Sequence, residues 1–272
     1  MLSKKEIIMS IEKAKKIILE NGNSFHSKVI NKFRDTGWHV LVSPYYSDSY
    51  TNKPREIDLV VEKDYFVKEA FGSVIGKIIV RLFVECKYFN KTHVFWFDKK
   101  NKAQAQRRIV SDTIFDPSYE NIQILSHRYL SEDKVAKLYA SETNPSTRNE
   151  QFYKAISQSL SAMTYFQGRP SNVSREDTGR EGVLSELIYP VIICNRFDNF
   201  FSCDIENEDN IQLIESNFQF EVQYAYFDNK QRKKNEYFLV DIVDFNNMDS
   251  FTKLMEESEI KALKQKLRDE AC

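Results

Sequence analysis

The stretch KIIVRLFVECKYF, from Lys77 to Phe89, decides the fold, because it reads as one long β-strand with two different faces. Its even-numbered positions form an almost unbroken apolar series: Ile78, Val80, Leu82, Val84, Cys86 and Tyr88. Its odd-numbered positions include the charged residues Arg81, Glu85 and Lys87. Side chains alternate between the two faces of a strand. Glu85 and Lys87 are therefore predicted to point the same way.

A second charged strand precedes this one. Residues Pro54 to Val60 read PREIDLV, and Glu56 and Asp58 share one face of a strand predicted over residues 55–62. Charges on core strands are unfavourable unless they are paired, bind a metal or face solvent. Two carboxylates and a lysine that converge on one sheet face would form a site for a divalent cation and a phosphate. The alternative interpretation is a solvent-exposed strand face with an ordinary Glu–Lys pair, which is common in antiparallel sheets.

Length and composition set the broad class. The 272 residues suffice for one large domain or two small ones, and either would bury a substantial core. A hydrophobic content of 42% and a charged content of 29% are those of an ordinary soluble globular protein. Because the net charge is −1, the chain as a whole does not attract nucleic acid, and a polyanion would need a local basic patch.

The cysteines and the apolar runs predict the compartment. Cys86, Cys194, Cys203 and Cys272 form no C-x-x-C pair, which favours reduced thiols over disulfides or a structural zinc site. No apolar stretch approaches the roughly 18–20 residues of a membrane helix. The charged start, Met1 to Glu6, differs from a signal peptide. We therefore expect a cytoplasmic protein without membrane association.

Hydrophobic periodicity predicts an α/β protein. Helices are predicted over residues 3–20, 24–35, 99–109, 132–140, 149–166 and 250–267. Strands are predicted over residues 39–46, 55–62, 77–89 and 121–126, and in the apolar runs 187–194, 218–227 and 237–243. The polar segment 167–182 is predicted to be an exposed loop, and Lys230 to Lys234 a hairpin tip.

The order of these elements, with Asp58 on one strand and Glu85-Cys86-Lys87 on the next, resembles the PD-(D/E)xK nuclease superfamily. The longer string Gly37-Trp38, Tyr45-Tyr46, Asp48 and Lys53 to Asp58 is similar to its stand-alone bacterial members. The resemblance implies a restriction-endonuclease-like core, in which helices flank a central mixed sheet. It divides the chain into an N-terminal amphipathic helix (1–22), the nuclease core (23–166) and a C-terminal portion of strands and helices (167–272), expected to pack on the same domain.

The resemblance also implies metal-dependent hydrolysis of phosphodiester bonds. Asp58 and Glu85 would bind Mg²⁺ or Mn²⁺ through hard oxygen ligands, and the backbone carbonyl of Cys86 would add another oxygen. Lys87 would orient the attacking water and stabilise charge on the transition state.

One position departs from the family pattern. Many relatives carry a glutamate on the first core helix, whereas this chain reads Ser24-Phe-His-Ser-Lys-Val29 there. His26 is the nearest candidate to replace it, with a helix-surface role as the alternative. Glu56 is a further candidate ligand, unless it pairs with a nearby cation. Gln158 matches a position where related nucleases carry a glutamine near the site.

A basic run follows the strand that ends near Phe89. Its members, Lys99, Lys100, Lys102, Arg107 and Arg108, have no acid between them. One interpretation is a surface that contacts the phosphate backbone of nucleic acid. The alternative is a solvated helix face.

We expect a metal-dependent endonuclease that acts on DNA in restriction-like or anti-phage defence. The defence setting follows from family analogy alone. One alternative is a nuclease-fold subunit that mainly binds nucleic acid or a partner protein, and another is an RNase activated by a partner or signal. A homodimer or a partner protein in a defence complex is compatible with each.

Overall fold

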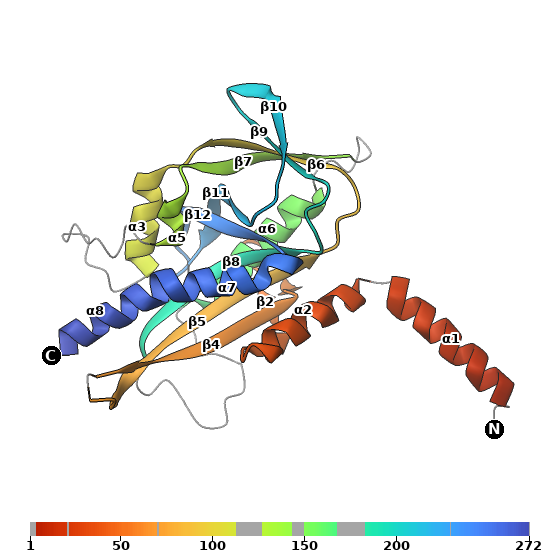
Figure 1. Ribbon diagram of the computed structural model, residues 1–272, viewed down its shortest axis with the longest axis horizontal. Coiled ribbons are helices and arrows are strands. Elements are labelled where there is room, and N and C mark those ends of the chain that lie inside the picture. The colour runs from red at the N-terminus through yellow and green to blue at the C-terminus, as the bar shows by residue number, and fades with distance from the viewer. Residues whose placement is uncertain are drawn as a thin grey trace.

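The computed structural model describes residues 4–20, 22–69, 71–112, 127–142, 150–167, 183–228 and 230–271. Its centre is a ten-stranded mixed sheet in the order β1-β4-β5-β8-β12-β11-β7-β6-β9-β10, flanked by helices (Figure 1). These strands are β1 His39–Val42, β4 Leu59–Lys68, β5 Val74–Lys87, β6 His93–Lys99, β7 Lys134–Ser141, β8 Val183–Cys194, β9 Phe200–Asp204, β10 Asn207–Leu213, β11 Phe218–Phe227 and β12 Lys233–Asp244. A two-stranded sheet pairs β2, Tyr45–Ser47, with β3, Pro54–Glu56. The expected α/β class with a large mixed sheet is confirmed.

Helices cover both faces of the large sheet. The described helices are α1 Lys4–Glu20, α2 Asn23–Asp35, α3 Lys102–Asp112, α5 Arg128–Ser131, α6 Glu150–Phe166, the 3₁₀ turn η2 Phe245–Asn247, α7 Met248–Met255, the π-helical turn η3 Glu256–Ile260 and α8 Lys261–Ala271. In Figure 1, α7 and α8 lie across the front of the sheet, and α1 projects away from the body. Among the described helices, none combines the length and the apolar character that crossing a membrane would require.

Strand β5 lies at the centre of the part of the sheet that β4, β5, β8 and β12 form. It pairs antiparallel with β4 and parallel with β8, and β8 pairs parallel with β12. The register aligns Lys87 with Cys194 and Cys194 with Asp244, so these three strands end at one edge. The sheet thus takes its central strands from both the predicted core and the predicted C-terminal portion.

Two apolar clusters sandwich β5, as its alternating sequence predicts. Ile78, Val80, Leu82, Val84 and Cys86 belong to the cluster that also contains the buried side chains of α2, α7 and α8. Phe83, on the other face, belongs to the cluster built with α6. The helices therefore bury both faces of β5, including its charged positions.

The buried charges of β5 are paired within the sheet. Lys77 Nζ lies 3.2 Å from Asp64 Oδ2. Arg81 Nε donates to Glu62, and Arg81 Nη1 lies 2.8 Å from Glu186 Oε1. Pairing of this kind is what makes charge tolerable on a strand that is buried on both faces.

The predicted strand over residues 55–62 is wrong in its continuity. β3 ends at Glu56 in the small sheet, and β4 begins at Leu59 in the large one, so the chain changes sheets across Ile57 and Asp58. The alternation of apolar and charged residues continues without change through Ile57 and Asp58, so it did not reveal this break. Asp58 consequently lies at the start of β4 rather than within a strand.

The predicted helix over residues 132–140 is also wrong, because this segment contains β7. Its Lys, Ala and Leu residues favour a helix locally, but pairing with β6 and β11 outweighs that preference. The strands β6, β9 and β10 were not predicted. The predicted strand at 121–126 lies outside the described residues, as does nearly all of the predicted loop at 167–182.

Substitution of Phe83 measures how much the packing of β5 against α6 contributes to stability. Its side chain is fully buried, and its ring stacks on Phe166 with 5.9 Å between the ring centroids. We expect Phe83→Ala to lower the free energy of unfolding by about 3–5 kcal/mol, because it leaves a cavity in the core. Urea denaturation measures this change. Phe71→Ala, at a side chain that is 97% exposed, is the matched control and should change stability by less than about 0.5 kcal/mol.

Candidate active site

The register of β4 and β5 brings Asp58 next to Glu85. Leu59 pairs with Val84, so the residue that precedes β4 lies beside the residue after Val84. Asp58 Oδ2 accepts a hydrogen bond from the backbone N–H of Cys86 at 2.8 Å. The Asp58 carbonyl accepts another from the N–H of Ser43, also at 2.8 Å. These two bonds fix both the backbone and the carboxylate of Asp58.

Lys87 connects the two carboxylates. Its Nζ lies 2.7 Å from Glu85 Oε2 and 3.9 Å from Asp58 Oδ2. Glu85 and Lys87 therefore share a face, as the alternation predicted. Two acids and one amine from adjacent parts of the sheet gather at the end of β5.

Burial gives Glu85 an unusual proton affinity. Removal from water raises the pKa of its carboxyl to about 7, with Lys87 opposing the shift and the charge of Asp58 adding to it. Burial also acts to lower the pKa of Lys87, but the charges of Glu85 and Asp58 outweigh it and hold this pKa above its ordinary value. The site therefore keeps its ammonium charged and holds Glu85 close to its titration point at neutral pH.

One oxygen of Glu85 has no hydrogen-bond partner among the residues that the structure describes. Glu85 Oε1 is buried and accepts no hydrogen bond from the described residues. A buried carboxylate oxygen without a donor is costly, and a bound cation would satisfy it. The donor set of Asp58 and Glu85 suits a hard divalent cation such as Mg²⁺ or Mn²⁺.

His26 also lies beside this site. Its Nε2 is 3.6 Å from Asp58 Oδ2. Potential ligand atoms of His26, Asp58 and Cys86 all lie within 4.8 Å of one another. The structure therefore brings the helix histidine to the position where the resemblance expected a helix acid.

Cys86 contributes its backbone rather than its thiol. Burial raises the pKa of the thiol well above its usual range, which disfavours the thiolate form that metals bind. Its N–H holds Asp58, as described above. Ligation through its carbonyl oxygen stays a prediction.

Glu56 and Gln158 are joined by a hydrogen bond on the segment that leads into Asp58. Glu56 faces Tyr45 across β2 and β3, and its hydrogen-bonded carboxylate raises the pKa of that phenol. Because the chain changes sheets after Glu56, the predicted common strand face with Asp58 is wrong. Gln158 Nε2 donates to the Glu56 carbonyl at 3.2 Å and so supports the segment that leads into Asp58.

The basic run does not act as one surface. Lys100 is buried, and its Nζ donates to the carbonyl of Tyr129 at 3.0 Å and to Gln219 Oε1 at 2.9 Å. Arg108 is buried over the ring of Phe238, with Nη1 3.2 Å from Glu236 Oε2. Backbone contact through these two residues is therefore a wrong prediction, since the interior already engages both.

The other three basic residues are exposed. Lys99 ends β6, Arg107 lies on α3, and Lys102 pairs with Asp133. Phosphate contact through them stays a prediction. The buried residues of α3 join the cluster on the α7 and α8 face, which is opposite to the face that carries Glu85.

Sequence reasoning gave no role to two residues that lie close to the site. Tyr46 is buried, and burial, with a contribution from the charge of Glu85, raises its pKa to about 12. Asn195 donates its N–H to the Lys87 carbonyl, and its side-chain oxygen accepts from the N–H of Phe89 at 2.7 Å. Tyr46 stands in the quoted motif string, which could have marked it. Asn195 follows β8, and no local pattern links it to β5.

We compared the chain with protein-family models, with curated proteins and with solved structures, and none of the three comparisons returned a match. The functional argument therefore rests on the geometry of the residues themselves.

The pKa of Glu85 predicts a pH-dependent effect of Glu85→Gln on the metal-free protein. A raised pKa means that the folded state holds its proton more tightly than the unfolded chain. The contribution of Glu85 to stability is full below about pH 4.5 and is lost as the pH rises through about 7. Relative to wild type, Glu85→Gln should become more stable between pH 5 and pH 8, by up to about 3 kcal/mol.

Urea denaturation in EDTA at these two pH values measures this difference. Glu142→Gln, at an exposed carboxyl, is the control and should show the same difference from wild type at both. A pH-independent effect of Glu85→Gln would contradict the proposed proton affinity of the site.

Proposed function

We propose that this protein is a metal-dependent nuclease that hydrolyses phosphodiester bonds, with DNA as its substrate. The observation that carries the proposal is the convergence of Asp58 and Glu85 on Lys87, with one buried Glu85 oxygen that accepts no hydrogen bond from the described part of the chain. Carboxylates that hold a cation beside a fixed amine are the arrangement needed to bind and polarise a phosphodiester. The endonuclease assignment and the defence setting rest on the family resemblance.

Each residue has a distinct task in this proposal. Asp58 and Glu85 would hold Mg²⁺ or Mn²⁺, which when bound polarises the phosphate and lowers the pKa of a bound water. Lys87 places a positive charge where negative charge develops on the phosphate oxygens. The N–H of Cys86 keeps the Asp58 carboxylate oriented, so its position does not have to be set at each turnover.

Glu85 links metal binding to proton release. Its carboxyl has a pKa of about 7, so part of the metal-free population is protonated at neutral pH. A carboxylic acid must lose its proton to ligate a cation. Cleavage should therefore increase as the pH rises through about 7.

Cleavage assays test the proposal directly. Plasmid DNA, single-stranded DNA and RNA are incubated with the full chain in Mg²⁺, Mn²⁺ or EDTA. We expect metal-dependent cleavage of DNA by the wild type. The variants Asp58→Asn, Glu85→Gln and Lys87→Met should each lose at least about 100-fold in rate, because each removes a ligand or a transition-state contact.

Binding measurements separate the alternatives. The three variants should still bind DNA, and the controls Glu142→Gln and Lys261→Met, at exposed positions, should cleave like the wild type. Cleavage of RNA alone would support the RNase alternative. If the wild type cleaves no substrate with any metal, and the three variants bind DNA as tightly as the wild type, the enzyme assignment is contradicted and a binding subunit is supported.

The position of His26 beside Asp58 predicts that its removal affects cleavage differently with Mn²⁺ and with Mg²⁺. Imidazole is a better ligand for transition metals than for Mg²⁺. If His26 assists Asp58 at the metal, His26→Ala should lower Mn²⁺-supported cleavage by about tenfold and Mg²⁺-supported cleavage by less than about twofold. Rates at matched metal concentrations measure this difference. His39→Ala, at an exposed histidine on β1, is the control. Equal losses with both metals would exclude His26 as a ligand.

A further inference from the structure

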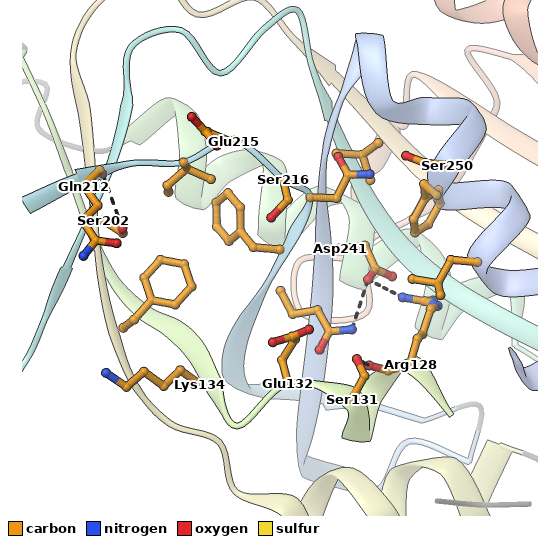
Figure 2. A pocket seen from close by; sticks show the side chains of 18 of the residues that line it. Arg128, Ser131, Glu132, Lys134, Ser202, Gln212, Glu215, Ser216, Asp241 and Ser250 are labelled. Atoms are coloured by element: carbon orange, nitrogen blue, oxygen red, sulfur yellow. Dashed lines mark hydrogen bonds and ion pairs between the residues drawn. The ribbon is translucent and has the colours of Figure 1, made fainter. Parts of the chain in front are cut away.

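A cavity of about 990 Å³ lies apart from the candidate active site, with β11 and β12 on one side and α7 on another (Figure 2). Its lining holds five acids and three cations, and the cations pair with Asp241, Asp204 and Glu257. Glu132 and Glu215 are the remaining acids of the lining. Because this lining is net negative, the cavity would repel a polyanion. A surface for the phosphates of nucleic acid is therefore expected elsewhere on the molecule.

Two turns that are far apart in the sequence meet at the surface. One turn joins β2 to β3, and the other joins β11 to β12. Ser49 Oγ accepts a hydrogen bond from the N–H of Phe227 at 3.3 Å, and the rings of Tyr50 and Phe227 lie 5.3 Å apart between centroids. The two turns therefore form one continuous surface. We call it the paired tips, and define it as residues 48–55, 227, 228 and 230–234.

An aspartate holds each of these turns and pairs with an arginine. Asp48 Oδ1 accepts from two backbone N–H groups of its turn, at 2.8 and 3.0 Å, and Asp48 Oδ2 lies 3.4 Å from Arg55 Nε. Asp228 Oδ1 likewise accepts from two N–H groups of its turn, each at 2.9 Å, and Asp228 Oδ2 lies 2.7 Å from Arg232 Nη2. The aspartates of the paired tips are thus already engaged by the turns themselves.

The lysines of the paired tips have no such partner. The segments 45–56 and 226–236 together carry six cations and four acids. Besides the two aspartates, Glu236 Oε2 lies 3.2 Å from Arg108 Nη1, and Glu56 is hydrogen-bonded to the phenol of Tyr45. Within the described part of the chain, no acid forms an ion pair with the lysines that remain: Lys53, Lys230, Lys233 and Lys234. The paired tips are therefore locally positive on a chain whose net charge is −1.

An exposed aromatic ring lies among these cations. The side chain of Tyr50 is 60% exposed, although its ring contacts Phe227. Lys53 follows three residues later, and Lys233 pairs with Phe227 across β11 and β12. Surfaces that bind single-stranded nucleic acid combine cations, which pair with the phosphates, with aromatic rings on which unpaired bases stack. The paired tips offer both features.

Strand β2 connects the paired tips to the candidate active site. Besides burial, the charges of both Glu85 and Asp48 raise the pKa of Tyr46, so this side chain lies close to both carboxylates. Ser49, which contacts β11, follows Tyr46 by three residues, about 10 Å along an extended chain. A strand of nucleic acid that occupies the site would reach the paired tips within a few nucleotides.

We propose that the paired tips bind a single-stranded segment of nucleic acid, with its phosphates on the four lysines and an unpaired base on the ring of Tyr50. The surface supplies the backbone contact that Lys100 and Arg108 do not supply, because the interior engages those two side chains. The inference rests on the proposed function for its choice of nucleic acid. It adds the contact surface and the strandedness of the bound segment.

The salt dependence of binding tests the phosphate contacts. Fluorescence anisotropy measures binding of the full chain, in EDTA, to oligo(dT) of about 20 nucleotides between about 50 and 200 mM NaCl. We expect the wild type to bind with a Kd of about 10 µM or lower at the lowest salt. The triple variant Lys230→Gln, Lys233→Gln, Lys234→Gln should bind at least about tenfold more weakly. Its slope of log affinity against log salt should be shallower by about 2, since each lost contact removes about 0.7.

A second triple variant controls for the loss of charge. Lys13→Gln, Lys68→Gln, Lys261→Gln removes the same number of charges from exposed lysines on α1, β4 and α8. Its slope should equal that of the wild type. Both triple variants should keep the melting temperature of the wild type, because none of the six side chains belongs to the core.

Tyr50→Ser tests the stacked base. This variant should bind oligo(dT) about tenfold more weakly, with the salt slope unchanged, because stacking is not a phosphate contact. It should bind a duplex of the same length like the wild type, since a duplex offers no unpaired base. Phe71→Ser, at a side chain that is 97% exposed, is the control and should bind both ligands like the wild type.

Three results would overturn the inference: no binding of oligo(dT) by the wild type, an unchanged slope for the Lys230, Lys233 and Lys234 variant, or an unchanged affinity of Tyr50→Ser for oligo(dT). Displacement of oligo(dT) by poly-glutamate at equal charge concentration would also contradict it, because the surface would then recognise charge alone.

The same measurements separate this inference from the nuclease proposal. Asp58→Asn should bind oligo(dT) like the wild type, since Asp58 does not belong to the paired tips. If the wild type cleaves DNA but the lysine variant keeps its slope, this inference alone fails. If binding behaves as expected and the wild type never cleaves, the nuclease proposal alone fails.

Discussion

The burial of β5 on both faces is the constraint on which the rest of the structure depends. A strand covered on one face by α2, α7 and α8 and on the other by α6 is buried from Gly76 to Cys86. Each charge on it needs a partner inside the protein. Asp64 supplies one for Lys77, Glu62 and Glu186 supply two for Arg81, and Glu85 supplies one for Lys87. Glu85 is paired through Oε2 only, and its buried Oε1 accepts no hydrogen bond from the described residues, which is why the end of β5 is a candidate site.

Local sequence was sufficient to place Glu85 and Lys87 on one face of β5 and insufficient for their surroundings. Alternation predicted that Glu85 and Lys87 share a face, and their 2.7 Å contact agrees. It could not predict that the chain changes sheets at Ile57 and Asp58, because the period-2 pattern continues through the break. Lys100 and Arg108 were predicted to be part of a basic surface. In the structure they hydrogen-bond to Gln219 and Glu236, which follow more than one hundred residues later. Partners so distant in the chain leave no local pattern.

Asp241 and the candidate site share one row of the sheet. Asp241 pairs with Val191, and Val191 pairs with Val84, which precedes Glu85. Two strand spacings, about 10 Å, therefore separate the strand position of Asp241 from that of Val84. Rigid pairing across β5, β8 and β12 holds the two positions in a fixed relation.

The position of β8 has a consequence for synthesis of the chain. β8 is the parallel neighbour of β5, yet it begins only at Val183, and Asn195, which fixes the end of β5, contacts Phe89 across 106 residues. A nascent chain that has left the ribosome as far as α6 holds β4 and β5 but not the strand that covers the second edge of β5. That open edge invites pairing with other chains. The part of the sheet that carries the candidate site is therefore complete only after the C-terminal third has been translated, and until then the β4–β5 hairpin keeps one open edge.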